Sequence, residues 1–195
     1  MFIVDKKFPE FNLEVYNPAT GETPKMGSAD FKGKFLVLFF YPADFTFVCP
    51  TELADMARRQ EEFKSAGAEV IVVSTDTVFT HKAWVETEAL LKDFKFVMAA
   101  DHNGKLSKEL GIYDEETGIA QRAAFIIDGE GMLRGVDITS DNIGRSAGEV
   151  LRKVKALKFV TENKGKACPA SWDEGAKTLT PSIKIAGKVK EALDG

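Results

Sequence analysis

The sequence predicts an α/β fold in which helices flank a central mixed β-sheet. Three observations lead to this prediction. The segment FLVLFFY at residues 35–41 is apolar without alternation, which is typical of a strand buried on both faces. The segment AEVIVVSTD at residues 68–76 is a second apolar run, rich in β-branched side chains. Between the two, apolar residues recur at helical spacing, so the second strand is expected to run parallel to the first.

The helix between these two strands is expected to close at Gly67. Its periodic positions are Leu53, Met56, Ala57, Gln60 and Phe63. Pro50 fits the first helical position, because the N–H that proline lacks has no partner there. Cys49 is therefore expected at the cap or in the first turn, where unpaired backbone N–H groups face its sulfur.

A second helix and a third strand extend this pattern. The segment THKAWVETEALLKDF at residues 80–94 predicts a helix that covers the sheet, and FVMAA at residues 96–100 predicts a short strand. The three strands and two helices form a βαβαβ series. A short helix is expected around residues 105–110, followed by the turn-rich segment DEETG.

A hairpin and a longer helix are predicted next. AAFIID and MLRGVDI flank a turn at residues 129–131, and this pattern indicates a β-hairpin. The following helix has an apolar face made of Ile143, Ala147, Val150, Leu151, Val154 and Leu157. A strand–helix–strand unit followed by a hairpin and a helix is the element order of the thioredoxin-like fold.

Two regions of the chain are expected. Residues 1–164 form the thioredoxin-like domain. Residues 165–195 are rich in Gly, Pro, Ser and Lys and predict a mobile C-terminal arm that carries Cys168.

The composition excludes several classes of function. The net charge is −4 and basic residues are scattered among acidic ones, so neither a nucleic-acid-binding face nor a basic membrane anchor is evident. The first residues lack a signal sequence, and no apolar run is long enough to span a membrane, which predicts a cytoplasmic protein. Two distant cysteines in such a protein favour redox or catalytic use over a structural disulfide.

A metal centre is not expected. It would have to recruit Cys49, Cys168, His81 and His102, and none of these has the close paired spacing of zinc ligands. No organic cofactor is expected either.

Cys49 is the candidate nucleophile. Partial positive charge at a helix N-terminus stabilises a thiolate, the reactive form of cysteine. The alternative is that Cys49 is a small buried apolar residue. The next residues are Pro50, Thr51 and Glu52, so there is no C-x-x-C motif for disulfide exchange. A cysteine protease would need a histidine base, and neither histidine has a recognisable context.

Attack of a thiolate on a peroxide O–O bond fits the surrounding residues. Thr46 can direct its hydroxyl to the sulfur or to a peroxide oxygen, although a role as helix cap is equally compatible with its spacing. Pro42 offers an apolar shield without a donor. Glu52 alone would repel a thiolate, so an arginine is needed, and Arg122 precedes the strand AAFIID at the mouth of the sheet. The alternative for Arg122 is a solvated residue at the end of a strand.

Taken together, these residues resemble the peroxiredoxins. The family motif P-x-x-x-T-x-x-C is met by Pro42, Thr46 and Cys49. The segments FYPADFTFVCPTE, HKAWVE, QRAAFIID and ACPASW extend the resemblance over almost the whole chain. They are most similar to typical two-cysteine members of the bacterial alkyl hydroperoxide reductase type.

The resemblance implies a role for each candidate residue. Cys49 would be the peroxidatic cysteine that hydrogen peroxide or an organic hydroperoxide oxidises to a sulfenic acid. Cys168 would be the resolving cysteine that forms a disulfide with it, between subunits of a homodimer. Thr46 and Arg122 would activate the peroxide, Pro42 would shield the site, and Glu52 would hold the arginine.

The resemblance also implies partners. A flavoprotein disulfide reductase or a thioredoxin-like protein would reduce the disulfide, and homodimers would assemble into a decamer. A competing hypothesis is a redox-regulated, ring-forming chaperone or scaffold, in which the thiol acts as an assembly switch. The GGLG and C-terminal Tyr-Phe motifs of members that are sensitive to over-oxidation are absent, which predicts relative resistance to over-oxidation.

Overall fold

The computed structural model describes residues 4–194, and the chain divides into two compact units, Met1–Ala147 and Gly148–Gly195. The first unit contains the sheet and the candidate nucleophile. The second contains Cys168. The predicted C-terminal arm, residues 165–195, lies within the second unit, and its boundary at residue 165 stays a prediction.

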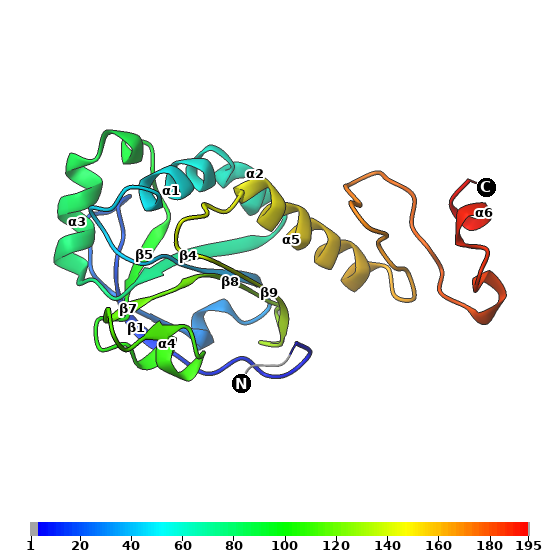
Figure 1. Ribbon diagram of the computed structural model, residues 1–195, viewed down its shortest axis with the longest axis horizontal. Coiled ribbons are helices and arrows are strands. Elements are labelled where there is room, and N and C mark those ends of the chain that lie inside the picture. The colour runs from blue at the N-terminus through cyan, green and yellow to red at the C-terminus, as the bar shows by residue number, and fades with distance from the viewer. Residues whose placement is uncertain (1–3, 195) are drawn as a thin grey trace. The chain divides into compact units, whose positions relative to one another are not determined.

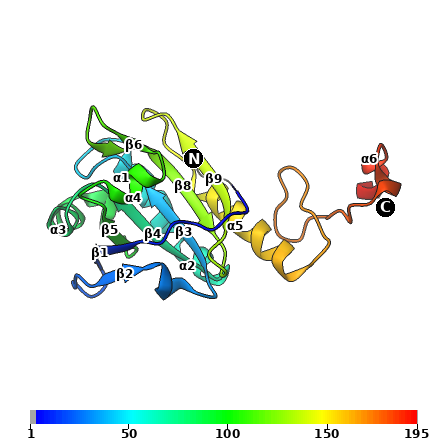
Figure 2. The same cartoon turned by 90° about the horizontal axis from the view of Figure 1, so that it is seen from below.

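A mixed β-sheet forms the centre of the first unit, as the sequence predicts (Figure 1). Among the described residues it has seven strands in the order β2-β1-β5-β4-β3-β8-β9 (Figure 2). The central pairs β3–β4 and β4–β5 are parallel, and the outer pairs are antiparallel. The strands are β1 (Asn12–Tyr16), β2 (Lys25–Gly27), β3 (Phe35–Phe40), β4 (Ala68–Ser74), β5 (Val97–Ala100), β8 (Arg122–Ile127) and β9 (Leu133–Thr139).

Strand β3 is the buried strand that the apolar segment at residues 35–41 predicts. Its side chains from Leu36 to Phe40 are all buried, which confirms that both faces of the strand are covered. It pairs in parallel with β4 and antiparallel with β8. The chain leaves β3 at Tyr41 and enters the loop that leads to Cys49.

Helices lie on both faces of this sheet. In Figure 1, α1 (Cys49–Arg58) and α2 (Gln60–Ser65) lie on one side, and α4 (Lys105–Glu109) lies on the other. The remaining helices of the first unit are α3 (Val78–Thr87) and the 3₁₀ turns η1 (Ser28–Phe31) and η2 (Ala89–Leu91).

The single helix predicted before Gly67 is instead two helices that meet at Arg59. The backbone of Arg59, at φ −107° and ψ 12°, departs from helical values and separates α1 from α2. Phe63 of α2 is buried in the core, where its ring meets Phe96 edge-on at 6.3 Å between centroids.

Ile143 does not belong to the last long helix, so that part of the prediction is wrong. Helix α5 is Ala147–Glu162, and Ile143 lies in the preceding loop with 59% of its surface exposed. The loop does not continue the helix because it positions Arg145, whose backbone and side chain both bind Glu52.

Four short strands are additions to the predicted pattern. Strands β1 and β2 extend the sheet beyond β5, and β6 (Tyr113–Asp114) and β7 (Ile119–Ala120) pair around the turn-rich segment. Each is at most five residues long, too short for a clear periodic signal.

The second unit consists of most of α5 and the segment that follows it. An isolated bridge pairs Ala167 with Leu179, and the ring of Trp172 packs on Phe159 of α5 at 5.0 Å between centroids. Further along are η3 (Ile183–Ile185) and α6 (Val189–Asp194). Within residues 4–194, no helix has the length and apolar character needed to cross a membrane.

Candidate active site

Cys49 is the first residue of α1, and its side chain is fully buried. Val48 is the N-cap residue, without a side-chain cap, and Pro50 occupies the first turn, where its missing N–H leaves no bond unmade. The prediction that Cys49 lies in the first turn of the helix is confirmed. Burial at a helix N-terminus keeps the sulfur away from bulk water and at the positive end of the helix dipole.

Arg122 lies beside this sulfur. Its Nη1 donates to Cys49 Sγ at 3.2 Å and to Glu52 Oε2 at 2.8 Å, and its Nε donates to the carbonyl oxygen of Asp141 at 2.7 Å. Sheet register explains this position, because Ala123 pairs with Phe40 and Arg122 therefore stands level with the end of β3. Only 3% of Arg122 is exposed, so the alternative of a solvated strand-end residue is wrong.

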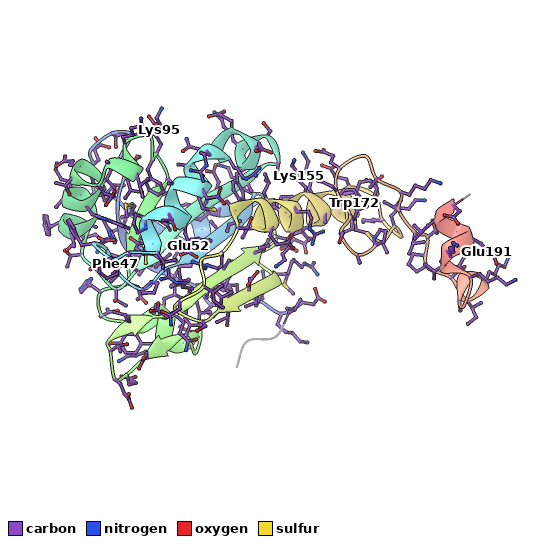
Figure 3. All side chains as sticks on the ribbon, turned by 45° about the horizontal axis from the view of Figure 1, so that its top comes forward. Phe47, Glu52, Lys95, Lys155, Trp172 and Glu191 are labelled. Carbon is purple, nitrogen blue, oxygen red and sulfur yellow. The ribbon has the colours of Figure 1, made fainter. Side chains whose placement is uncertain are left out.

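Glu52 projects from α1 (Figure 3). Its carboxylate pairs with two buried arginines. Its carboxylate accepts from Arg122 and also from Arg145, through the Arg145 backbone amide at 2.7 Å and Nε at 2.9 Å. Arg145 Nη2 donates to the carbonyl oxygen of Phe40 at 2.8 Å. Glu52 is thus a structural link between the helix that carries Cys49, strand β8 and the loop before α5.

Arg145 is the residue of this site that sequence reasoning missed. It lies between Ile143 and Ala147, two residues of the predicted apolar face of the last helix, and is not itself on that face, so no signal marked it as buried. Its guanidinium lies 3.6 Å above the ring of Phe39, and its Nη1 is buried without a hydrogen-bond partner among the described residues.

The charged groups beside the sulfur are paired with one another. Arg122 and Arg145 both bind the carboxylate of Glu52, and Arg122 Nη2 also lies 3.4 Å from Asp141 Oδ1. Burial lowers the pKa of Arg145, and the hydrogen bonds and negative charge of Glu52 oppose this effect. Arg122 thus presents its guanidinium to Cys49 Sγ while it is held in place by two carboxylates.

The loop between β3 and α1 is anchored by a buried polar cluster. Asp44 accepts from the Tyr41 hydroxyl at 2.6 Å and lies 2.8 Å from His81 Nδ1. The amide of Asp44 donates to Asp76 Oδ2 at 2.8 Å. Burial raises the pKa of Asp44, and the hydrogen bond and charge of His81 oppose this effect. These contacts fix the loop that carries the P-x-x-x-T segment.

Thr46 and Pro42 lie in this anchored loop. The Thr46 hydroxyl donates to the carbonyl oxygen of Ala43 at 2.8 Å, so its oxygen lone pairs remain for another partner. The alternative of a helix cap is wrong, because the N-cap residue is Val48. Pro42 is buried directly after Tyr41, and Phe47, labelled in Figure 3, is 91% exposed. The roles of Thr46 and Pro42 stay predictions.

Cys168 belongs to the second unit and is partly exposed. Its sulfur lies 3.9 Å from the carbonyl oxygen of Ala156 on α5, a weak contact in which the thiol is the donor. Desolvation raises the pKa of Cys168 above that of an ordinary thiol, and the positive charge of Arg152 opposes the rise.

The histidines are not arranged as metal ligands. His81 is engaged by Asp44 and faces the carbonyl oxygen of Ala99 at 3.3 Å, and His102 is exposed. Across residues 4–194 there is no group of three or more His, Cys, Asp or Glu side chains that could hold a metal ion.

Two protein families match the chain. The AhpC/TSA family matches residues 4–136, and the C-terminal domain of 1-Cys peroxiredoxin matches residues 156–195, the segment that contains Cys168.

Named relatives cover most of the sequence. Alkyl hydroperoxide reductase C of Amphibacillus xylanus is 47% identical over 161 residues, which are 83% of this chain and 86% of the relative. Alkyl hydroperoxide reductase C of Escherichia coli K12 is 41% identical over 189 residues, which are 97% of this chain and 100% of the relative.

Solved structures share the fold. The 2-Cys peroxiredoxin of Plasmodium vivax in its reduced form aligns with a TM-score of 0.91 and 29% identity, covering 97% of this chain and 100% of that chain. AhpC of Enterococcus faecalis aligns with a TM-score of 0.81 and 40% identity, covering 87% of this chain and 100% of that chain.

Proposed function

The chain belongs to the AhpC/TSA family and is a thiol-dependent peroxidase, a peroxiredoxin, and we propose which of its residues perform the reaction. Cys49 is the peroxidatic cysteine and Cys168 the resolving cysteine. The observation that supports this assignment most directly is the hydrogen bond from Arg122 Nη1 to Cys49 Sγ at 3.2 Å. It aims a fixed positive charge at a buried sulfur at the start of a helix.

The first step is attack of the Cys49 thiolate on one oxygen of the peroxide. An S–O bond forms, the O–O bond breaks, and the departing oxygen leaves as water or an alcohol after taking up a proton. Negative charge moves from the sulfur to the departing oxygen, so a donor that spans both positions lowers the barrier. Arg122 supplies this donor, the Thr46 oxygen accepts from the peroxide, and Pro42 limits the access of water.

Glu52 has a positioning role in this step. It holds Arg122 at 2.8 Å and is itself held by Arg145, so the guanidinium does not need to reorganise as charge moves. This accounts for an acidic residue in the first turn of a helix that carries a thiolate.

The second step joins the two cysteines. The Cys168 thiolate attacks the sulfur of the Cys49 sulfenic acid, a disulfide forms, and the hydroxyl group leaves as water. We place this disulfide between the subunits of a homodimer. A dithiol reductant, either a flavoprotein disulfide reductase or a thioredoxin-like protein, then returns both cysteines to thiols. Hydrogen peroxide and organic hydroperoxides are the proposed substrates, and the cytoplasm is the proposed location.

A surface of exposed aromatic residues supports assembly beyond the dimer. Phe45, Phe47 and Phe79 are 57%, 91% and 79% exposed, and the ring of Phe45 packs on Trp84 of α3 at 6.3 Å between centroids. Large apolar side chains that are solvent-exposed commonly mark protein interfaces. We propose that dimers assemble into a decamer through this surface.

The mass of the assembly tests this proposal. Phe79→Glu places a charge on α3 and should reduce the mass measured by light scattering to that of a dimer. Leu90→Glu, at an exposed apolar position on η2, is the matched control and should leave the mass unchanged. An unchanged mass for Phe79→Glu would remove this surface from the assembly.

The peroxidase chemistry is tested by adding about one equivalent of hydrogen peroxide to the reduced protein and to Cys168→Ser. Non-reducing gels and intact mass should show a covalent dimer in the wild type and a Cys49 sulfenic acid without a dimer in the variant. A monomer that has lost both thiols would indicate an internal disulfide instead. Two unreacted thiols would contradict the peroxidase assignment.

The role of Arg122 is tested by stopped-flow oxidation of Arg122→Ala. The loss of one preorganised donor should slow the reaction with peroxide about 10²- to 10³-fold. Arg134→Ala, an arginine on β9 that pairs with Asp128, is the control and should react at the wild-type rate. If Arg122→Ala kept the wild-type rate while its assembly changed, the ring-forming chaperone or scaffold would become the better hypothesis.

A further inference from the structure

Arg152 is a residue of α5, and the segment that carries Cys168 packs against this helix. The Cys168 sulfur lies 3.9 Å from the carbonyl oxygen of Ala156, and Ala156 is four residues after Arg152 in the helix. Residues four apart lie on the same side of a helix. The segment after Cys168 is fastened to this face, because Arg152 Nη1 donates to the carbonyl oxygen of Trp172 at 3.0 Å.

A second contact strengthens this attachment. The ring of Trp172, which is labelled in Figure 3, is buried and packs on Phe159 of α5 at 5.0 Å between centroids. Its Nε1 donates to the carbonyl oxygen of Ala176 at 3.1 Å. Cys168 is therefore held four residues before an anchored tryptophan. Its position along α5 depends on the residues that bind this segment.

The guanidinium of Arg152 has a fixed orientation. Nε lies 3.1 Å from Glu149 Oε2 and Nη2 lies 3.0 Å from Glu149 Oε1, while Nη1 binds the Trp172 carbonyl oxygen. All three nitrogens of the guanidinium form hydrogen bonds, so the side chain is already ordered. It therefore loses little conformational entropy when its charge interacts with a neighbouring group.

Among the charged groups around Cys168, Arg152 acts directly on the thiol. Arg152 is the cation whose charge favours the Cys168 thiolate, against the desolvation that favours the thiol. Glu149 and Asp173 are the acidic groups whose charges act on Arg152. The nearby ammonium of Lys155 pairs with Glu174 at 3.8 Å.

We propose that Arg152 is a positioning residue for the resolving step, which holds the Cys168 segment on α5 and supplies the charge that stabilises the attacking thiolate. This inference rests on the proposed role of Cys168. In that step Cys168 loses its proton, its sulfur forms a bond to the Cys49 sulfur, and the hydroxyl group of the sulfenic acid leaves and becomes water. Arg152 does not touch the peroxide, so the first oxidation of Cys49 should not depend on it.

The thiolate is tested first, in a form that does not depend on turnover. In a Cys49→Ser background Cys168 is the sole thiol, and the pH dependence of its alkylation by iodoacetamide reports the midpoint of its ionisation. Arg152→Gln should shift this midpoint to higher pH, and Arg152→Lys should keep it near the parent value. Lys155→Gln removes the same charge from the same helix and should leave it unchanged.

The resolving rate is tested next, with Cys49 present. After rapid oxidation by one equivalent of hydrogen peroxide, disulfide formation in Arg152→Gln should be roughly two- to fivefold slower at pH 7, as expected for one partly screened charge. The rate should recover as the pH is raised, and Arg152→Lys should stay close to the wild type. The rate of sulfenic acid formation should be the same in all variants.

These outcomes separate the inference from the proposed function. An alkylation midpoint in Arg152→Gln that moves no further than in Lys155→Gln would overturn the role of Arg152. A resolving rate that is slow at every pH, and equally slow in Arg152→Lys, would also overturn it, because the charge of Arg152 would then have no effect on the attacking thiolate. A wild-type protein that oxidises at Cys49 and never joins it to Cys168 would contradict the proposed function instead.

Discussion

Glu52 connects the chemistry of the site to the stability of the fold. Its carboxylate is buried and is shared by Arg122 and Arg145, which come from β8 and from the loop before α5. A buried charge without a partner is far more costly than a surface charge, so each member of this cluster needs the others.

Removing this carboxylate should therefore destabilise the protein. Glu52→Gln leaves Arg145 without a counter-charge in a buried position, and we expect a loss of about 3–5 kcal/mol in the free energy of unfolding. Urea titration measures the loss. Glu61→Gln, an exposed position on α2, is the matched control and should change the free energy by less than about 0.5 kcal/mol. A Glu52→Gln variant as stable as this control would show that the cluster is not a structural unit.

Proximity in sequence decided which site residues could be predicted. Pro42, Thr46, Cys49 and Glu52 lie on one short segment, where helix-start chemistry makes a nucleophile recognisable. Arg122 was found because the sulfur needed a counter-charge at the mouth of the sheet. Arg145 was missed because its partner is Glu52 rather than the sulfur, and a buried pair so distant in sequence leaves no periodic signal.

At the scale of elements, the central strands and the hairpin follow directly from apolar patterns. The turn between β8 and β9 shows how such a hairpin is held. Asp128 Oδ1 accepts from the amides of Glu130 and Met132 at 2.9 Å each, and Asp128 Oδ2 lies 2.7 Å from Arg134 Nε. The edges of the fold were less predictable, because β1 and β2 are short and gain stability from pairing with β5 and with each other rather than from their own patterns.

The Asp128 turn should make stability depend on pH. Burial tends to raise the pKa of Asp128, but hydrogen bonds from Met132, Arg134 and Glu130 lower it below the ordinary carboxyl value. A carboxyl with a lower pKa in the folded state binds fewer protons when folded, so its stabilising effect is present above the unfolded pKa of about 3.9 and is lost as the pH falls.

Asp128→Asn should accordingly lower the melting temperature more at pH 7 than at about pH 3, because the contribution of the carboxylate decreases as the pH falls below the unfolded pKa of about 3.9. Thermal unfolding at both pH values measures the difference. Glu130→Gln changes an exposed side chain of the same turn and serves as the control. If Asp128→Asn lowered the melting temperature equally at both pH values, the lowered pKa assigned to Asp128 would be contradicted.

At the scale of the whole molecule, catalysis requires a buried thiol to become accessible. Cys49 is fully buried in the first turn of α1, so the disulfide that we propose with Cys168 requires that turn to open. The outcome of a catalytic cycle then depends on whether opening precedes the arrival of a second peroxide.

The chain should resist over-oxidation. It lacks the GGLG and C-terminal Tyr-Phe motifs of members that are sensitive to over-oxidation. We expect Cys49 to reach the sulfinic acid only at peroxide concentrations far above those that support turnover. Intact mass after titration with peroxide and a reductant measures this. Sulfinic acid at concentrations only slightly above those needed for turnover would contradict the prediction.

The interruption at Arg59 limits how far such an opening can spread. Helical cooperativity is carried by the regular bonds from each amide to the carbonyl four residues back, and this pattern is interrupted at Arg59, whose amide donates to the Met56 carbonyl oxygen three residues back at 3.0 Å. Native-state hydrogen exchange should therefore show different protection in the two helices. The amides of α1 should exchange by local opening and be less protected than those of α2. The enzyme can expose its sulfur without releasing Phe63, the core side chain that α2 contributes.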